Sequence, residues 1–321
     1  MKPLTLLVAL LIAGGAGAQS PVEREAVVTI GGIRQYLTIN GKDDSLPLLL
    51  FLHGGPGGSM MRYASVIGDR LQEHFLVVHW DQRETGKTLE LNASPSPLTL
   101  RQFQSDTEEV IEWLLNEYGR DRLYLAGHSW GTSLGFHIAK HYPERLYAYL
   151  AIGAMINQTE SERIAREAML NHAHYFEDNA AVQELSSIRI PFEDATDLYY
   201  HRKHLATYAG RSRPLPRSYV KQWAQRWLPV FKEASAINLF ETLPRLHCPV
   251  YFLAGRNDLQ TNASLMEAYY QILEAPLKKF YWFERVGHGL PTSAAERMQA
   301  IIIEEILPET FERDALPVDD R

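Results

Sequence analysis

The sequence predicts an α/β fold in which helices cover both faces of a mostly parallel sheet. Several strand-like runs are apolar along their whole length, as expected for central strands that are covered on both faces. Longer segments with helical spacing separate these runs, and one long interval contains no convincing strand. The chain has 321 residues, a length that favours one large domain with an insertion, or two domains.

The composition is that of an ordinary globular protein. Hydrophobic residues make up 45% of the chain, which excludes an intrinsically disordered protein. The 39 acidic and 32 basic side chains give a formal net charge of −7. Because nucleic-acid binding requires a basic surface, we expect no nucleic-acid partner.

The first eighteen residues have the pattern of a secretory signal peptide. Lys2 precedes an apolar run over residues 4–13, and Ala16-Gly17-Ala18 forms a small-residue cleavage signal. The apolar run is shorter than the roughly 20 residues that a membrane span needs, so we expect no stable span after cleavage. The sequence therefore predicts a mature protein that is secreted or periplasmic, and its single cysteine, Cys248, excludes an intramolecular disulfide.

The predicted elements follow one another in a βα rhythm. The strand-like runs cover residues 27–30, 35–39, 46–52, 75–80, 123–126, 146–152, 250–254 and 279–283. The first two predict a hairpin across Gly31-Gly32. Helical spacing covers residues 99–118, 132–142 and about 294–307. This order predicts a sheet with antiparallel entry strands, sandwiched by helices.

One interval, from about residue 155 to 243, interrupts this rhythm. It is polar, aromatic and mostly helical in spacing, and it is too long for a loop within a compact domain. We therefore expect an inserted helical cap over residues 155–243. The predicted organisation is a signal peptide at 1–18, a core formed by 19–154 and 244–321, and this cap.

The most specific motif is Gly127-His128-Ser129-Trp130-Gly131, a G-x-S-x-G pattern between a predicted strand and a predicted helix. A serine in such a sharp turn projects its hydroxyl from the edge of the sheet. The two glycines allow the strand and the helix to approach closely. Ser129 is therefore the candidate nucleophile.

A glycine-rich turn, His53-Gly54-Gly55-Pro56-Gly57-Gly58, follows the most apolar strand. Acyl transfer needs main-chain N–H groups directed at the developing oxyanion, and glycine lets the main chain approach without a Cβ. We expect the N–H groups of Gly55 and Trp130 to form this oxyanion hole. A phosphate-binding loop is the competing interpretation, but the glycine patterns of such loops are absent from the sequence.

A serine nucleophile needs a base and an acid that orients the base. Asp258 and His288 both lie in loops at predicted strand ends, where α/β sheets collect functional side chains. The chain order Ser129, Asp258, His288 is the order of an α/β-hydrolase triad. Glu284, at the end of its own strand, is the main alternative to Asp258.

Together with Asp81-Gln82-Arg83-Glu84-Thr85-Gly86-Lys87-Thr88, these motifs resemble the proline iminopeptidase group of the α/β-hydrolases. The resemblance extends from His53 to His288. It implies an α/β-hydrolase fold with an inserted helical cap, a Ser129–His288–Asp258 triad, and removal of an N-terminal residue, often proline, from peptides. The segment from Asp81 to Arg83 resembles scaffolding near the site, without a catalytic step.

The sequence also departs from this family. Glu84 stands where the family usually has glycine, and no Trp-Glu dipeptide is present to supply one of the family's ammonium-binding glutamates. The cap offers carboxylates and aromatic side chains as candidates for substrate binding. These candidates are Glu160, Glu162, Glu177, Tyr175 and Trp223.

The residues thus predict two-step acyl transfer through an acyl-enzyme, with no cofactor and no metal, on a small peptide or another small acyl substrate. The leading hypothesis is an aminopeptidase of the proline iminopeptidase type. The second keeps the triad but acts on esters, lactones or small amides. The third is a non-catalytic binding protein on a hydrolase scaffold.

Overall fold

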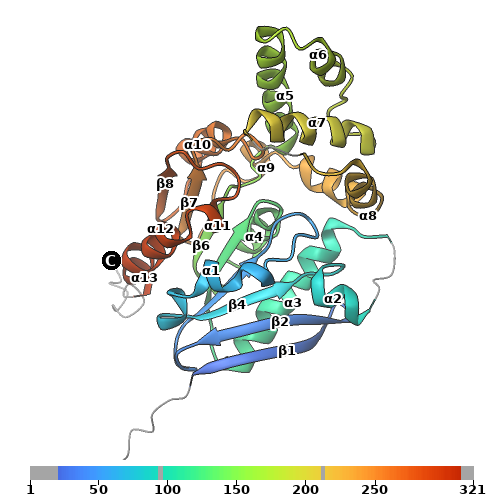
Figure 1. Cartoon of the computed structure of the whole chain (residues 1–321). Coiled ribbons are helices and arrows are strands. Elements are labelled where there is room, and N and C mark those ends of the chain that lie inside the picture. Colours follow the sequence, from blue (N-terminus) through green and yellow to red (C-terminus); the bar gives the residue numbers. More distant parts are fainter. Residues whose placement is uncertain (1–20, 93–96, 211–213, 312–321) are drawn as a thin grey trace, which may run out of the picture.

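The computed structural model describes residues 21–92, 97–210 and 214–311. The predicted signal peptide lies outside these residues. Within the described residues, eight strands form one sheet in the order β1-β2-β4-β3-β5-β6-β7-β8 (Figure 1).

The sheet begins with the predicted hairpin. β1 (Val22–Ile30) pairs antiparallel with β2 (Ile33–Gly41), and both residues of the connecting turn, Gly31 and Gly32, have positive φ angles of 56° and 75°. Glycine adopts this conformation without steric cost, which explains the tight connection. Both strands are longer than predicted because pairing continues through half-exposed polar residues at their ends.

The remaining neighbours form the predicted parallel part of the sheet. Every adjacent pair from β4 across to β8 is parallel, whereas β2 pairs antiparallel with β4. The strands are β3 (Leu48–Leu52), β4 (Leu76–Asp81), β5 (Leu123–His128), β6 (Leu146–Ile152), β7 (Val250–Gly255) and β8 (Lys278–Phe283). The α/β-hydrolase type of sheet predicted from the sequence is therefore confirmed.

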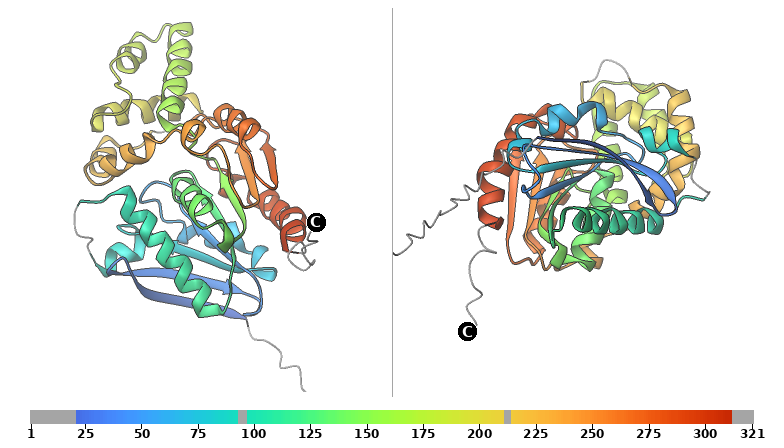
Figure 2. Two further views of the ribbon diagram at one scale, coloured as in Figure 1. Left: turned by 180° about the vertical axis from the view of Figure 1, so that it is seen from behind. Right: turned by 90° about the horizontal axis from the view of Figure 1, so that it is seen from below.

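Helices cover both faces of this sheet, and β3 shows why its residues are apolar throughout. Leu48, Leu50 and Leu52 belong to one hydrophobic cluster with α3 (Leu100–Tyr118), α4 (Trp130–His141) and α10 (Ala263–Ile272). Leu49 and Phe51 point to the opposite face, toward α1 (Ala64–Gly68) and α12 (Ala295–Ile301). The view from below in Figure 2 shows helices on either side of the sheet.

Short elements complete the core. They are the 3₁₀ turns Met61–Tyr63, Leu71–Glu73 and Pro143–Arg145 and the helix α2 (Gly86–Leu91). The predicted closing helix at 294–307 follows a short extra helix, α11 (Leu290–Ser293), and consists of α12, a π-helical turn at Ile302–Ile306 and the start of α13 (Leu307–Phe311). Pro308 has no N–H for the carbonyl of Glu304 and crowds the preceding turn, which favours the wider π turn there.

The interval between β6 and β7 is helical. It contains α5 (Gln158–Tyr175), α6 (Asn179–Ser186), α7 (Ala195–Tyr208), α8 (Arg217–Ser235) and α9 (Leu239–Thr242). Figure 1 shows α5, α6 and α7 standing away from the sheet, with α8 between them and the core. These five helices lie within residues 155–243, the interval predicted as the cap, and we keep that name for it. None of the helices in the described parts of the chain is long and apolar enough to cross a membrane.

Candidate active site

Ser129 lies in a sharp turn between β5 and α4. Its φ and ψ angles are 54° and −122°, a conformation that non-glycine residues rarely adopt. A Cβ at Gly127 would lie 2.8 Å from the carbonyl oxygen of Gly131, and one at Gly131 would lie 2.2 Å from the carbonyl oxygen of Leu52. Both glycines are therefore required for the close approach of strand and helix, and the strained turn presents the hydroxyl at the sheet edge.

The structure brings together the three residues predicted as a triad. The Oγ atom of Ser129 lies 2.9 Å from Nε2 of His288. The Nδ1 atom of His288 lies 2.8 Å from Oδ2 of Asp258. The three side chains come from the ends of β5, β7 and β8, and so parallel strands deliver them to the same edge of the sheet.

Asp258 is held as a carboxylate. Burial alone would raise its pKa, but the adjacent His288 and the hydrogen bonds from Thr261 outweigh burial and lower the pKa to about 2. The main-chain N–H and the hydroxyl of Thr261 donate to Oδ1 and Oδ2 of Asp258 at 3.1 and 2.9 Å. An ionised carboxylate only accepts hydrogen bonds, so Nδ1 of His288 carries the proton and Nε2 is left to accept from Ser129.

Glu284, the alternative acid, lies elsewhere. Its Oε1 atom pairs with Arg256 at 3.2 Å, and its side chain is 64% exposed. His128, next to the serine, is directed behind the triad, with Nε2 2.9 Å from the carbonyl oxygen of His288. Burial lowers the pKa of His128 to about 4, so this imidazole is neutral, and its Nε2 donates to the His288 carbonyl oxygen rather than facing Ser129.

The glycine-rich turn lies directly against Ser129. A Cβ at Gly54 would be 3.1 Å from the Cβ of Ser129, and one at Gly55 would be 2.7 Å from the N atoms of Gly57 and Gly58. Gly55 and Ser129 both line the same cavity. Trp130 is the first residue of α4, so its N–H has no helical acceptor. Gly55 and Trp130, the residues predicted to form the oxyanion hole, thus lie close to Ser129 in space and in sequence, respectively.

Gln82 connects these two segments. Its Nε2 atom donates to the carbonyl oxygen of His53 at 3.1 Å, and its Oε1 atom accepts from Nε1 of Trp130 at 3.0 Å. Its main-chain N–H donates to Nε2 of His53 at 3.2 Å, while Nδ1 of His53 faces the carbonyl oxygen of Gly54 at 2.8 Å. Buried His53 therefore carries its proton on Nδ1, and its two ring nitrogens link the glycine-rich turn to Gln82.

Arg83 and Glu84, which follow Gln82, make contacts that hold the fold together. Arg83 and Asp106 form a buried ion pair, with Nε and Nη2 donating to the two carboxylate oxygens at 3.0 and 2.9 Å. Glu84 has a φ of 61°, the left-handed conformation that a glycine would adopt freely. Its carboxylate lies 3.4 Å from Nε of Arg226 in α8. The departure from glycine therefore adds a charge that meets the cap.

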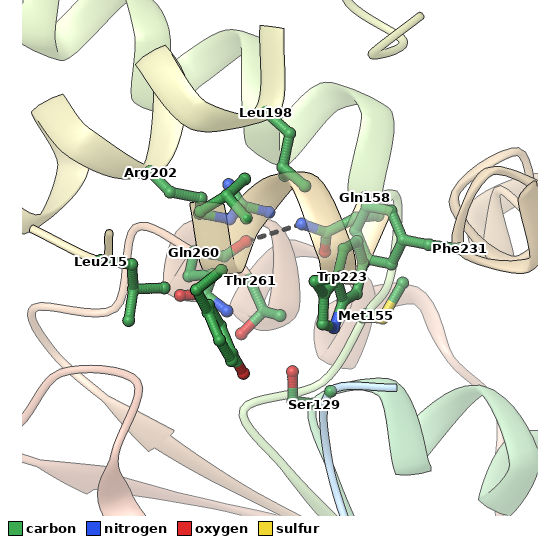
Figure 3. A pocket seen from close by; sticks show the side chains of 13 residues that line it. Ser129, Met155, Gln158, Leu198, Arg202, Leu215, Trp223, Phe231, Gln260 and Thr261 are labelled. Carbon is green, nitrogen blue, oxygen red and sulfur yellow. Dashed lines mark hydrogen bonds between the residues drawn. The ribbon is translucent and has the colours of Figure 1, made fainter. Parts of the chain in front are cut away.

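A cavity of about 210 Å³ separates Ser129 from the cap (Figure 3). The cap contributes Trp223, one of the predicted substrate-binding candidates, and its indole Nε1 donates to the carbonyl oxygen of Pro56 at 3.0 Å. The other lining residues are Gly55, Met155, Gln158, Leu198, Arg202, Leu215, Tyr219, Val220, Phe231, Gln260 and Thr261. None of these described lining residues is acidic.

Three of the predicted substrate-binding candidates lie away from this cavity. Glu160 pairs with Arg163 at 3.1 Å on the outside of α5, and neither Glu177 nor Tyr175 lines the cavity. Tyr175 is 81% exposed. It is the last residue of α5, about 25 Å along the helix axis from Gln158, because each residue advances the helix by about 1.5 Å.

Glu162 is buried behind the cavity. Its Oε1 and Oε2 atoms accept from Nη2 and Nη1 of Arg202 at 2.6 and 2.7 Å, and Oε1 also accepts from Nε2 of Gln158 at 2.7 Å. Burial would raise the pKa of Glu162, but Arg202 and the other partners lower it. The carboxylate is therefore ionised and already paired.

Sequence reasoning missed Thr261, Gln158 and Arg202. The position of Thr261, three residues after Asp258, is a local signal, because a threonine there can bond back to the carboxylate. Gln158 and Arg202 gave no such signal, because their place at the cavity depends on how the cap folds over the core. In the described parts of the chain, no group of three or more His, Cys, Asp or Glu side chains is arranged to hold a metal ion.

Sequence comparisons relate the chain to known hydrolases. The family model for the "alpha/beta hydrolase fold" matches residues 47–291. "Probable aminopeptidase YbaC" of Bacillus subtilis (strain 168) is 32% identical over 290 residues, which cover 81% of this chain and 89% of that protein. "Proline iminopeptidase" of Thermoplasma volcanium is 23% identical over 182 residues, 56% of this chain and 59% of that protein.

Solved structures share the architecture at lower sequence identity. A proline iminopeptidase from Mycobacterium smegmatis superposes with a TM-score of 0.65 and 19% identity, covering 91% of this chain and 100% of that one. An epoxide hydrolase from Vigna radiata gives a TM-score of 0.57 and 19% identity, with 89% and 98% coverage. These likenesses show the fold, which carries more than one chemistry.

Proposed function

This chain belongs to the α/β hydrolase family, and we propose that it is a serine hydrolase that removes N-terminal residues from small peptides. The proposal of a serine hydrolase rests on the hydrogen bonds that connect Ser129 to His288 and His288 to Asp258, at 2.9 and 2.8 Å. The aminopeptidase assignment draws on the relative that is 32% identical and on the motifs that resemble proline iminopeptidases.

In the proposed acylation step, Nε2 of His288 takes the proton of the Ser129 hydroxyl as Oγ bonds to the substrate carbonyl carbon. The carbonyl electron pair moves to the oxygen, which the N–H groups of Gly55 and Trp130 stabilise. When the intermediate collapses, the C–N bond breaks and the proton on Nε2 passes to the leaving amine. The acyl group remains as an ester on Ser129.

Deacylation repeats these steps with water. Nε2 of His288 takes a proton from water as the oxygen bonds to the acyl carbon, and the bond to Ser129 Oγ then breaks as Oγ regains the proton. Asp258 stabilises the imidazolium in both steps, because its low pKa keeps it negatively charged. The free N-terminal amino acid is then released.

A panel of chromogenic substrates tests this proposal. We expect release of naphthylamine from at least one of the proline, alanine and phenylalanine naphthylamides, and none of that release after Ser129→Ala. Hydrolysis of p-nitrophenyl esters without release from any of these free-amine substrates would reject the aminopeptidase assignment and retain the serine hydrolase.

A second candidate function is hydrolysis of esters, lactones or small amides. The observation that favours it is the absence of an acidic side chain among the described residues that line the cavity. Glu162, a cap carboxylate that contacts the lining residues Gln158 and Arg202, is paired with Arg202. An aminopeptidase must therefore recognise the substrate's amino group by another means.

We further propose that residues 1–18 direct export and are removed after Ala18. The sequence pattern of charge, apolar run and small residues supports this proposal. Expression of the full chain in a bacterium, followed by mass spectrometry of the periplasmic or secreted protein, tests it. A mature N-terminus at Gln19 is expected, and an intact N-terminus in the cytosolic fraction would contradict export.

A further inference from the structure

Gln158, the first residue of α5, has a buried acceptor atom at the cavity. The residue is 2% exposed and lines the cavity together with Ser129. Its Oε1 atom is buried and has no hydrogen-bond partner among the described residues. A buried carbonyl oxygen without a hydrogen bond destabilises the fold. A molecule in the cavity that donates a hydrogen bond to this atom would remove that cost.

The orientation of the carboxamide is fixed by its other end. Nε2 donates to Oε1 of Glu162 at 2.7 Å and to the carbonyl oxygen of Gln260 at 2.8 Å. Both partners only accept, so exchanging the nitrogen and oxygen would place three acceptors together. Figure 3 shows the bond to Gln260 and the carboxamide oxygen on the Ser129 side of the nitrogen.

The group behind Gln158 strengthens this acceptor. The ionised carboxylate of Glu162 accepts from Nε2 and polarises the carboxamide, which increases the negative charge on Oε1. The Glu162 charge is itself balanced by the two hydrogen bonds from Arg202. The cap therefore presents a polarised neutral oxygen to the cavity in place of a free carboxylate.

We propose that Oε1 of Gln158 accepts a hydrogen bond from the α-amino group of the substrate's N-terminal residue and so selects substrates with a free amine. This inference rests on the proposed aminopeptidase function. It gives that function an amine-recognition residue that is not a glutamate. Gln158 acts in specificity, since the bond-making steps belong to Ser129 and His288.

The test compares two competitive inhibitors of p-nitrophenyl ester hydrolysis, alaninamide and propionamide, which differ only by the α-amino group. In the wild-type protein we expect the inhibition constant of alaninamide to be at least about tenfold lower than that of propionamide. A hydrogen bond from a charged donor strengthens binding by about tenfold or more. In Gln158→Met the ratio of the two inhibition constants should fall toward one. A merely structural role would weaken both inhibitors equally and leave the ratio unchanged.

Glu160→Gln is the matched control, because Glu160 lies in the same turn of α5 and does not line the cavity. Its ratio should equal that of the wild type. Equal inhibition by the two amides in the wild-type protein would overturn the proposal without any variant, even if Gln158→Met does not fold. Failure of the proposed function would instead appear as no naphthylamine release, a separate assay.

Discussion

The indole Nε1 of Trp130 donates a hydrogen bond to Oε1 of Gln82 at 3.0 Å, and this contact joins the serine turn to the glycine-rich turn. The same carboxamide donates to the carbonyl oxygen of His53 at 3.1 Å. Gln82 is buried, so both hydrogen bonds are shielded from water. One side chain thus fixes the distance between the segments that carry the Gly55 and Trp130 N–H groups.

We predict that Gln82→Leu lowers kcat by about tenfold to a hundredfold with a smaller change in KM. The variant leaves the His53 carbonyl and the Trp130 indole unpaired and lets the two proposed oxyanion donors move apart. Loss of one such donor costs about 10²–10³ in kcat. Ester hydrolysis kinetics measure the effect. The melting temperature should also fall, because each unpaired buried group costs about 1–3 kcal/mol.

Gln35→Leu is the matched control for this prediction. Gln35 is equally buried and accepts from Nε1 of Trp80 at 2.9 Å, but it lies on β2 beside the Asp106 ion pair and not at the cavity. It should lower the melting temperature and leave kcat near the wild-type value. Equal loss of kcat in both variants would mean that Gln82 acts through stability alone.

Asp258→Asn should lower kcat by about 10³- to 10⁴-fold while the protein stays folded. An amide in place of the carboxylate no longer requires the proton on Nδ1 of His288, and the imidazolium loses its stabilising charge. Glu284→Gln, which removes the rival carboxylate, should retain full activity because Glu284 pairs with Arg256 at the surface. If Glu284→Gln lowers kcat more than Asp258→Asn does, the assignment of Asp258 as the acid is wrong.

Stability should fall steeply between about pH 6.5 and pH 4. Burial lowers the pKa to about 4 for four histidines, His53, His79, His128 and His201. The unfolded chain takes up these protons near pH 6.5, but the folded chain takes them up only near pH 4. Acid therefore favours unfolding by about 1.4 kcal/mol per pH unit for each histidine across this window.

The variant His79→Leu measures the contribution of one of these four histidines to the pH dependence of stability. His79 is buried on β4 and stacked on Phe51 with ring centroids 5.2 Å apart, and burial outweighs its contact with the main chain of Ala64 and lowers its pKa to about 4. Urea unfolding at pH 7, 6 and 5 should give a pH slope for the variant that is smaller by about one proton. An unchanged slope would show that His79 is protonated equally in both states.

The parts of the site that depend on local sequence were predictable. The G-x-S-x-G turn, the glycine-rich turn and the strand-end positions of Asp258 and His288 all follow from patterns within a few residues of each side chain. Parallel strands bring such ends to one edge, so the three side chains meet without further information. The division of the closing helix was missed because the effect of Pro308 reaches back into the preceding turn.

The cap candidates show what local patterns leave open. Successive helical residues are about 100° apart around the axis, so Glu160, two positions after Gln158, lies on nearly the opposite side of α5. Glu162, four positions after Gln158, shares its side and meets its carboxamide. Which side faces the core depends on the packing of α5 against α7 and α8, contacts between residues that are far apart in sequence.

Covalent labelling of Ser129 tests the central claim most directly. A fluorophosphonate probe, followed by mass spectrometry of the intact protein and of its peptides, should show one adduct per chain, located on Ser129. Ser129→Ala, matched to the wild type in melting temperature, should take up none. A folded wild-type protein that remains unlabelled, or a label carried by another residue and kept in Ser129→Ala, would contradict the account and favour a binding protein on a hydrolase scaffold.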